Sequence, residues 1–208
     1  VLSGKMHFVG PDQLHGFRQR LTTDIYSSDF GWVKQEWIGI KETRGASIDA
    51  VMGHRRQYNA AGYTGDAVHV GRWHTPLSYD EETHFRAVEY LRAQGEAGDR
   101  DRPFLLVASY HHPHEPFWPP QRYWDMYAEA DVDVAEFPTG FEAQRSQMDL
   151  NLNAYHGVER FPLRDVDSMR RLRRAHGLTS YMDDKVGGLL AILEETGLPD
   201  NTVIVFAS

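Results

Sequence analysis

Uninterrupted runs of apolar residues mark the candidate strands of this chain. One run covers residues 104–108, Phe-Leu-Leu-Val-Ala, and follows an Arg-Pro pair. A second covers residues 203–206, Val-Ile-Val-Phe, and is rich in β-branched side chains. Residues 1–3, Val-Leu-Ser, read as the end of another strand. Because runs of this length suit strands that are covered on both faces, we predict a mainly parallel sheet.

Apolar residues at helical spacing predict two helices. The longer runs over residues 165–195, with aspartates at its start and Gly197 just past its end, as the helix dipole and C-capping favour. The shorter runs over residues 79–93 and precedes the strand at 104–108. The apolar positions expected to face inward are Met169, Leu172, Met182, Val186, Leu189, Leu190 and Leu193 in the longer helix and Phe85, Val88 and Leu91 in the shorter.

Alternation of helices and strands predicts an α/β protein whose mainly parallel central sheet is flanked by helices. In such sheets the functional loops leave the carboxyl ends of the strands. This directs attention to the segments after residues 1–3, after residues 104–108 and beyond Ser208. Segments 11–78 and 117–162 show little periodicity, so we expect functional loops there or short elements that the pattern does not reveal.

Composition narrows the function classes. The 208 residues carry a net charge of −8, which argues against nucleic acid as a partner because phosphate binding relies on clustered Lys and Arg. The one basic run, residues 170–174, is interpreted as a solvated helix face. No apolar run approaches the ~20 residues of a membrane span, so we expect no membrane partner. The absence of cysteine excludes disulfides and thiolate metal sites in this chain.

The first candidate chemistry directly follows the strand end at residues 1–3. Lys5 and His7 stand two apart in an extended segment and would project to the same side. Together they offer a fixed positive charge and a titratable donor, which suits an anion such as sulfate or phosphate. The alternative is that both are ordinary surface residues.

The second candidate follows the strand at 104–108. The segment 110–117 reads Tyr-His-His-Pro-His-Glu-Pro-Phe, and its prolines stiffen the backbone. Three histidines in four residues at the mouth of a parallel sheet could be metal ligands, sulfate donors or general acids. The alternative is a polar loop whose histidines are only hydrogen-bonded.

Long ordered stretches of the chain resemble the sulfatases of the alkaline-phosphatase superfamily, and among them the choline-sulfatases. The first reads Gly-Lys-Met-His-Phe-Val-Gly-Pro-Asp-Gln-Leu-His-Gly-Phe over residues 4–17. The resemblance is weakest in 33–78 and 139–164. The other matching stretches are 21–26, 29–32, 112–116, 123–124 and 180–187.

The resemblance implies that residues 1–208 are an internal part of a sulfatase catalytic domain with an incomplete alkaline-phosphatase-like fold. A formylglycine nucleophile, made in a C-x-P-S-R motif, would lie before Val1. A divalent cation, usually calcium, would be held by an Asp pair near the family's N-terminus and by a D-H-G or D-N-G sequence after Ser208. We therefore expect no metal ligand in this chain and no activity from it alone.

The resemblance also implies roles for three residues. Lys5 matches the lysine that bridges nucleophile and sulfate, and His7 matches the histidine beside the nucleophile hydroxyl. His114 matches the histidine that donates to the sulfate or to the leaving oxygen. A competing match is Gly71-Arg72-Trp73-His74, which also looks like the family's G-K-x-H element. The flanks of Lys5 and His7 favour the first assignment.

The implied substrate is a small sulfate ester, with choline sulfate first. A quaternary ammonium is typically held against aromatic faces. Trp32 stands where the family places a choline-facing tryptophan, and Phe117 is the second choice. The segment from Ile40 to Thr75 departs from choline-sulfatases, which leaves the head group open.

Two other functions stay open. One is a phosphonate or phosphate monoester hydrolase of the same superfamily, and the other is a non-catalytic binding protein that keeps the fold. We expect a cytoplasmic protein and leave a homo-oligomer open.

Overall fold

The structure is a computed structural model that describes residues 1–8, 11–25, 68–98, 102–114, 117–127, 139–156 and 166–208. The chain divides into two compact units. The first unit contains residues 1–31, 73–112 and 181–208, and the second contains residues 32–72 and 113–180. Among the described residues, no helix combines the length and the hydrophobicity that crossing a membrane requires.

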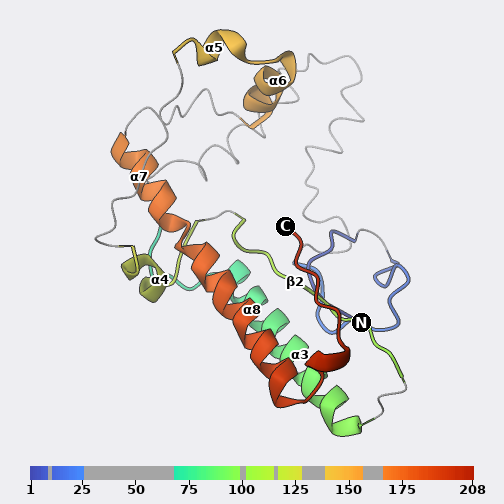
Figure 1. Cartoon of the computed structure of the whole chain (residues 1–208). Coiled ribbons are helices and arrows are strands. Elements are labelled where there is room, and N and C mark those ends of the chain that lie inside the picture. The colour runs from blue at the N-terminus through green and yellow to red at the C-terminus, as the bar shows by residue number, and fades with distance from the viewer. Residues whose placement is uncertain (9–10, 26–67, 99–101, 115–116, 128–138, 157–165) are drawn as a thin grey trace. The chain divides into compact units, whose positions relative to one another are not determined.

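The first unit is built on two short parallel strands (Figure 1). Strand β1 (Leu2–Gly4) pairs with β2 (Val107–Ser109), with Leu2 opposite Val107. Both strands lie where the apolar runs placed them, although β2 begins later than predicted. Leu2 is fully buried, as a strand covered on both faces requires.

Gly4 ends β1 at a point where the two backbones nearly touch. Its φ is 112°, in the region that side chains disfavour. A Cβ built at this position would lie 1.8 Å from the carbonyl oxygen of Ser109. That same oxygen accepts the backbone N–H of Lys5 at 2.9 Å. Glycine at position 4 therefore allows the close backbone approach that places the backbone of Lys5 beside β2.

Helix α3 (Thr75–Ala97) is longer than predicted at both ends. Pro76 in the first turn suits a helix start because it gives up no hydrogen bond there, and Gly98 ends the helix with φ 62°. Phe85, predicted to face inward, is 54% exposed, so that prediction is wrong. The buried positions of this helix are Leu77, Tyr79, Asp80, Thr83, Ala87 and Leu91.

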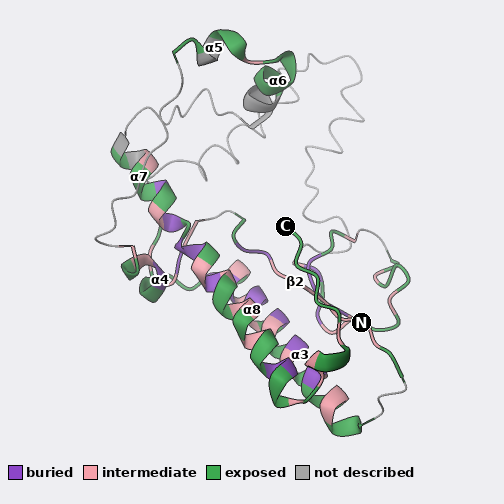
Figure 2. Ribbon diagram, in the orientation of Figure 1, coloured by how far each residue is buried: buried purple, intermediate pink, exposed green. Residues whose placement is uncertain are grey.

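Helix α8 (Gly177–Glu195) runs alongside α3 in the first unit from Tyr181 onward (Figure 1). Leu91 of α3 packs against Ile192 and Leu193 of α8. Figure 2 shows buried positions on both helices, and this cluster lies at their contact. Gly197, with φ 67°, ends the helix as its position predicted. A short 3-10 helix, η4 (Pro199–Asn201), follows.

The predicted helix over residues 165–195 is two helices, α7 (Val166–Ala175) and α8. The break falls at His176, whose N–H bonds to the carbonyl of Arg173 rather than four residues back. A Cβ at Gly177 would lie 2.7 Å from the carbonyl oxygen of Tyr123, so this crossing requires glycine. The apolar spacing continues across the break, which is why the pattern missed it.

The apolar run at residues 203–206 is not a strand in this structure, so that prediction is wrong. Val203 is 90% exposed, and within the described residues the run pairs with no strand. An apolar run shows that a segment suits burial, but a strand also needs a partner for its N–H and C=O groups.

The second unit contains α4 (Gln121–Asp125), α5 (Phe141–Gln144), α6 (Gln147–His156) and α7. The first three lie in the segment predicted as loops with hidden short elements. The apolar cluster of this unit consists of Val68, Val70, Phe117, Trp124, Leu172 and Ala175.

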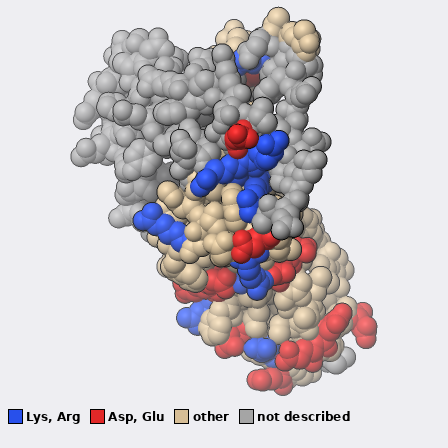
Figure 3. Space-filling view, turned by 90° about the vertical axis from the view of Figure 1, so that its left-hand side faces the viewer, with Lys and Arg blue, Asp and Glu red and all other residues tan. Residues whose placement is uncertain are grey.

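The basic run on α7 is partly tied to its surroundings. Arg170 pairs with Asp167 at 3.1 Å, and Arg174 lies 4.0 Å over the ring of Trp124. Arg171 donates to the carbonyl of Val68. Figure 3 shows basic side chains next to acidic ones on the described surface that faces the viewer.

Candidate active site

The segment after β1 (residues 5–8, here the β1 segment) is held by a buried carboxylate. Asp24 Oδ2 accepts the backbone N–H groups of Met6 at 3.0 Å and Phe8 at 3.4 Å. The same oxygen lies 3.1 Å from an Arg20 nitrogen, and both side chains are almost fully buried. Arg20 also donates to the carbonyl of Gly4. One ion pair therefore fixes the backbone on both sides of His7.

His7 lies within this segment in the left-handed region, with φ 56° and an exposed side chain. A non-glycine residue in this left-handed region is strained by about 1 kcal/mol and persists only when its surroundings hold it there. The bonds from Met6 and Phe8 to Asp24 supply that restraint.

Lys5 is buried at the end of β1. Its ammonium nitrogen Nζ lies 3.2 Å from His111 Nδ1, and both residues are less than 10% exposed. A buried cation needs a partner because desolvation disfavours its charge. The contact joins the two loops that leave the carboxyl ends of β1 and β2, where the α/β topology predicted a functional site.

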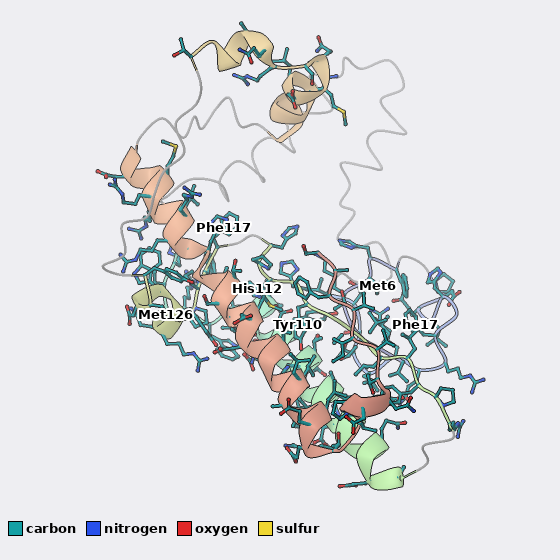
Figure 4. The ribbon with its side chains drawn as sticks, in the orientation of Figure 1. Met6, Phe17, Tyr110, His112, Phe117 and Met126 are labelled. Carbon is teal, nitrogen blue, oxygen red and sulfur yellow. The ribbon has the colours of Figure 1, made fainter. Side chains whose placement is uncertain are left out.

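The loop after β2 (residues 110–114, here the β2 loop) is held by a second buried carboxylate. Asp80 of α3 accepts the backbone N–H of His111 at 2.6 Å and that of His112 at 2.9 Å. Its Oδ2 also lies 2.5 Å from His112 Nδ1. Asp80 is fully buried, so three donors compensate a carboxylate that water does not reach. Figure 4 shows Tyr110 and His112 on the chain that follows β2.

The His112 ring lies in an enclosed, ring-lined position. The rings of His74, His111 and Tyr181 stand edge-on to it, with centroids 5.4 to 5.7 Å away. Tyr181 donates to Glu81, which also pairs with Lys185 at 2.7 Å. Burial, and then the charge of Glu81, raises the pKa of the Tyr181 hydroxyl, which keeps it protonated as a donor.

Two tyrosines connect α3 to the loops. The Tyr110 hydroxyl lies 2.9 Å from His84 Nδ1, and burial raises the pKa of Tyr110 while it lowers the pKa of His84. Tyr79 donates to the carbonyl of Thr23 at 2.9 Å. Burial raises the pKa of Tyr79 to about 12, so it also stays a donor at neutral pH. These contacts fix α3, and with it Asp80, beside the β1 and β2 segments.

The predicted site residues fall in different parts of the structure. Lys5 and His7 share the first unit, and His114, which is exposed, belongs to the second. Phe117 also belongs to the second unit, where its ring packs in the apolar cluster 5.4 Å from the His176 ring. Trp32 lies outside the described residues. Their roles stay predictions.

The competing match divides between two environments. Arg72 belongs to the second unit and lies 5.1 Å over the Trp118 ring. His74 belongs to the first unit, where it is buried at the start of α3 with its ring edge-on to His112. Both residues therefore have structural contacts that account for their positions.

The described residues do not form a metal centre. They contain no group of three or more His, Asp or Glu side chains arranged to hold a metal ion. The two buried carboxylates, Asp24 and Asp80, instead accept N–H groups of the backbone and side chains. None of these described residues is assigned as a metal ligand.

Sequence reasoning missed Asp24, Arg20 and Asp80, and it considered His111 only as one of three histidines in the loop after β2. One of them left a readable signal. Asp80 lies on the buried stripe of α3, three residues after Leu77 and seven before Ala87. A carboxylate on the apolar stripe of a helix must find buried donors, so it points to a nearby polar site.

The comparison with protein families decides the class of this chain, because the sulfatase family model matches residues 25–208. The chain belongs to the sulfatase family. This membership implies an alkaline-phosphatase-like α/β fold, and the described residues show a small parallel sheet with helices. It also supports the hydrolysis of sulfate esters as the family's chemistry.

Three curated relatives are similar to this chain. A choline-sulfatase from Rhizobium meliloti (strain 1021) is 36% identical over the whole chain, which covers 39% of that protein. An arylsulfatase from Clostridium perfringens (strain 13 / Type A) is 25% identical over 99% of the chain and 42% of its own length. The multifunctional alkaline phosphatase superfamily protein PehA from Trinickia caryophylli is 29% identical over 86% of the chain and 35% of its own length. The chain therefore spans about two fifths of these relatives.

Proposed function

We propose that the protein carrying this chain hydrolyses a sulfate ester and that its substrate is choline sulfate. Membership of the sulfatase family supports the hydrolysis, and the 36% identity to a choline-sulfatase supports the substrate. The structural observation that carries the proposal is Lys5, a cation buried where two loops leave the carboxyl ends of parallel strands.

In this proposal Lys5, His7 and His114 have different catalytic roles. The Lys5 ammonium stabilises negative charge on the sulfate, and His7 acts as the base that helps to expel sulfate from the covalent intermediate. His114 donates a proton toward the leaving oxygen. Fixed donors aimed at developing charge usually supply the largest share of such catalysis. Segments of the protein outside this chain would supply the formylglycine nucleophile and the ligands of a divalent cation, with calcium expected.

The test is turnover by the complete protein on an aryl sulfate and on choline sulfate. Lys5→Ala, His7→Ala and His114→Ala should each lower kcat at least ~100-fold, the scale for one preorganised stabilising group. Arg86→Ala is the control, because Arg86 is exposed on α3 and its pairing with Glu82 is loose at 3.9 Å. If Lys5→Ala were neutral while Arg72→Ala abolished turnover, the site assignment would be wrong.

The choline assignment is tested by Trp32→Ala. Loss of cation–π contact with the head group should cost about ten- to thirtyfold in kcat/KM on choline sulfate, from roughly 1–2 kcal/mol. An uncharged aryl sulfate should be affected much less. Equal losses on both substrates would make Trp32 a packing residue and leave a sulfatase of another substrate.

A second candidate activity is phosphonate or phosphate monoester hydrolysis. It is favoured by the 29% identity to a protein named as a multifunctional member of the alkaline phosphatase superfamily. Comparing kcat/KM on an aryl sulfate with kcat/KM on matched aryl phosphate and phosphonate esters separates the two activities. A protein that turns over none of these esters would be a non-catalytic relative.

A further inference from the structure

Two adjacent histidines of the β2 loop contact groups of opposite hydrogen-bonding character. His111 Nδ1 lies 3.2 Å from the ammonium nitrogen of Lys5. His112 Nδ1 lies 2.5 Å from a carboxylate oxygen of Asp80. All four residues are buried.

The partner of each imidazole determines where its proton resides. A lysine ammonium can only donate, so His111 Nδ1 must accept and the proton of that neutral ring sits on Nε2. The Asp80 carboxylate already accepts two backbone N–H groups, so it acts as the acceptor for His112 Nδ1–H as well. The two neighbouring rings therefore require opposite tautomers.

The second ring nitrogen of His112 has different surroundings. His112 Nε2 is buried and, among the described residues, has no hydrogen-bond partner. A proton on Nε2 would be a buried N–H donor without an acceptor, whereas a proton on Nδ1 is donated to Asp80. The surroundings therefore favour the Nδ1–H tautomer over the Nε2–H tautomer.

We propose that Asp80 is a positioning residue for Lys5, acting through these two histidines locked in opposite tautomers. Asp80 fixes the backbone of His111 and the ring of His112, and the fixed loop presents the lone pair of His111 Nδ1 to the Lys5 ammonium. With the other tautomer, His111 would present an N–H to the ammonium and displace it. The location of the buried cation thus depends on a helix residue 75 positions away in sequence.

The tautomers do not depend on the proposed function, but the consequence for turnover does. Long-range ¹H–¹⁵N spectra of the complete protein, labelled with ¹⁵N-histidine, report which ring nitrogen carries the proton. We expect Nε2–H for His111 and Nδ1–H for His112, with the signals assigned from His111→Asn and His112→Asn. Finding both rings in the same tautomer would overturn the proposal, whether or not the protein turns over a sulfate ester.

Asp80→Asn then tests the control by Asp80. The amide has one acceptor oxygen, so it cannot accept both from the His111 N–H on one side and from the two His112 N–H groups on the other. We expect either the His112 proton to move to Nε2 or the His111 backbone N–H to lose its hydrogen bond, and neither change in Glu82→Gln, an exposed change on the same helix. Unchanged His111 and His112 signals in a folded Asp80→Asn protein would overturn the proposal.

Turnover distinguishes positioning from simple stabilisation of the fold. His111→Asn places an amide oxygen where it can accept from Lys5, whereas His111→Ala removes the acceptor. We expect His111→Ala to lower kcat by about 10- to 100-fold, as misplacement of a catalytic group does, and His111→Asn to retain most of it. Equal losses in kcat would contradict the proposal. A wild-type protein without turnover would contradict the proposed function alone, because the spectra still report the tautomers.

Discussion

The β1 segment and the β2 loop are both fixed by a buried aspartate, but different groups compensate the charge of the two aspartates. Each is held by a buried aspartate from elsewhere in the chain that accepts two backbone N–H groups. Asp24 is neutralised by Arg20, a permanent cation. Asp80 is instead compensated by an imidazole and the backbone. One loop therefore rests on a buried pair with a permanent cation, and the other on hydrogen bonds from two backbone N–H groups and an imidazole.

Because of this difference, substitution of each aspartate should leave different groups without a partner. Without Asp24, a buried guanidinium charge remains beside two unpaired N–H groups. Without Asp80, the groups that lose their acceptor are two backbone N–H groups and an imidazole, which can release its proton as a guanidinium cannot. Because an uncompensated buried charge costs more than an unpaired neutral group, the β1 segment should be the more sensitive of the two.

The largest expected effect is therefore that of Asp24→Ala. It should lower the free energy of unfolding of the complete protein by about 3–5 kcal/mol, the usual cost of breaking a buried pair from one side. Urea denaturation measures this change. Asp12→Ala is the matched control, because Asp12 bonds the backbone of Leu14 and His15 at an exposed site. A loss no larger than that control would refute the ion-pair interpretation.

Adding Arg20→Met to Asp24→Ala sharpens this test. The double variant removes the orphaned charge, so it should be more stable than Asp24→Ala alone by about 1–2 kcal/mol. A double variant that is less stable would mean that the bonds from Arg20 to backbone carbonyls matter more than its charge.

Asp80→Ala should have the next largest effect. Two backbone N–H groups and an imidazole lose their acceptor, which costs about 2–4 kcal/mol in unfolding free energy at roughly 1–3 kcal/mol for each buried unsatisfied group after partial relaxation. The same urea titration gives the value. If this loss exceeded that of Asp24→Ala, the expected order of the two stability losses would be wrong.

A smaller effect is expected at His7, where strain and chemistry can be separated. His7→Gly relieves the positive φ and His7→Ala does not, so the glycine variant should be more stable than the alanine variant by about 1 kcal/mol. Both should lose turnover equally if the imidazole is needed. Unequal turnover would show that the shape of the backbone contributes as well.

The smallest expected effect is the pH response of His84 beside the β2 loop. Burial lowers its pKa from 6.5 in the folded protein, so the unfolded chain binds a proton first as the pH falls. Stability should thus decrease as the pH drops through and below about 6.5. In His84→Gln this part of the decrease should be absent, with pH 8 as the reference at which both proteins are compared. Parallel pH curves would contradict this origin.

Local sequence pattern predicted β1, β2 and most of the length of α3 and α8, because apolar runs and helical spacing reflect burial along one element. The inward positions were only partly right, since Leu91 and Leu193 are buried but Phe85 and Leu190 are exposed. The pattern predicted Lys5 and His7 as a candidate anion site for the same reason, since both follow a strand end. The run at 203–206 was misjudged because the pattern contains no information about a pairing partner.

The supports of the site lie beyond such patterns. Asp24 bonds to Met6 from 18 residues away, and Asp80 bonds to His111 from 31 residues away. No spacing rule connects residues so distant, and only tertiary structure brings them together. Of these residues, only Asp80 could be recognised from the sequence, because it is a carboxylate on the buried face of a helix.

The crossing at Gly4 also limits how this protein can be diversified. Any side chain at position 4 would overlap the Ser109 carbonyl, so a saturation library should return glycine there and nothing else. Positions such as Met6 and Leu14 are exposed and should accept many replacements. Natural variation or engineering toward a new substrate can therefore change exposed loop residues such as these. Position 4, which directly precedes Lys5, should not accept such changes.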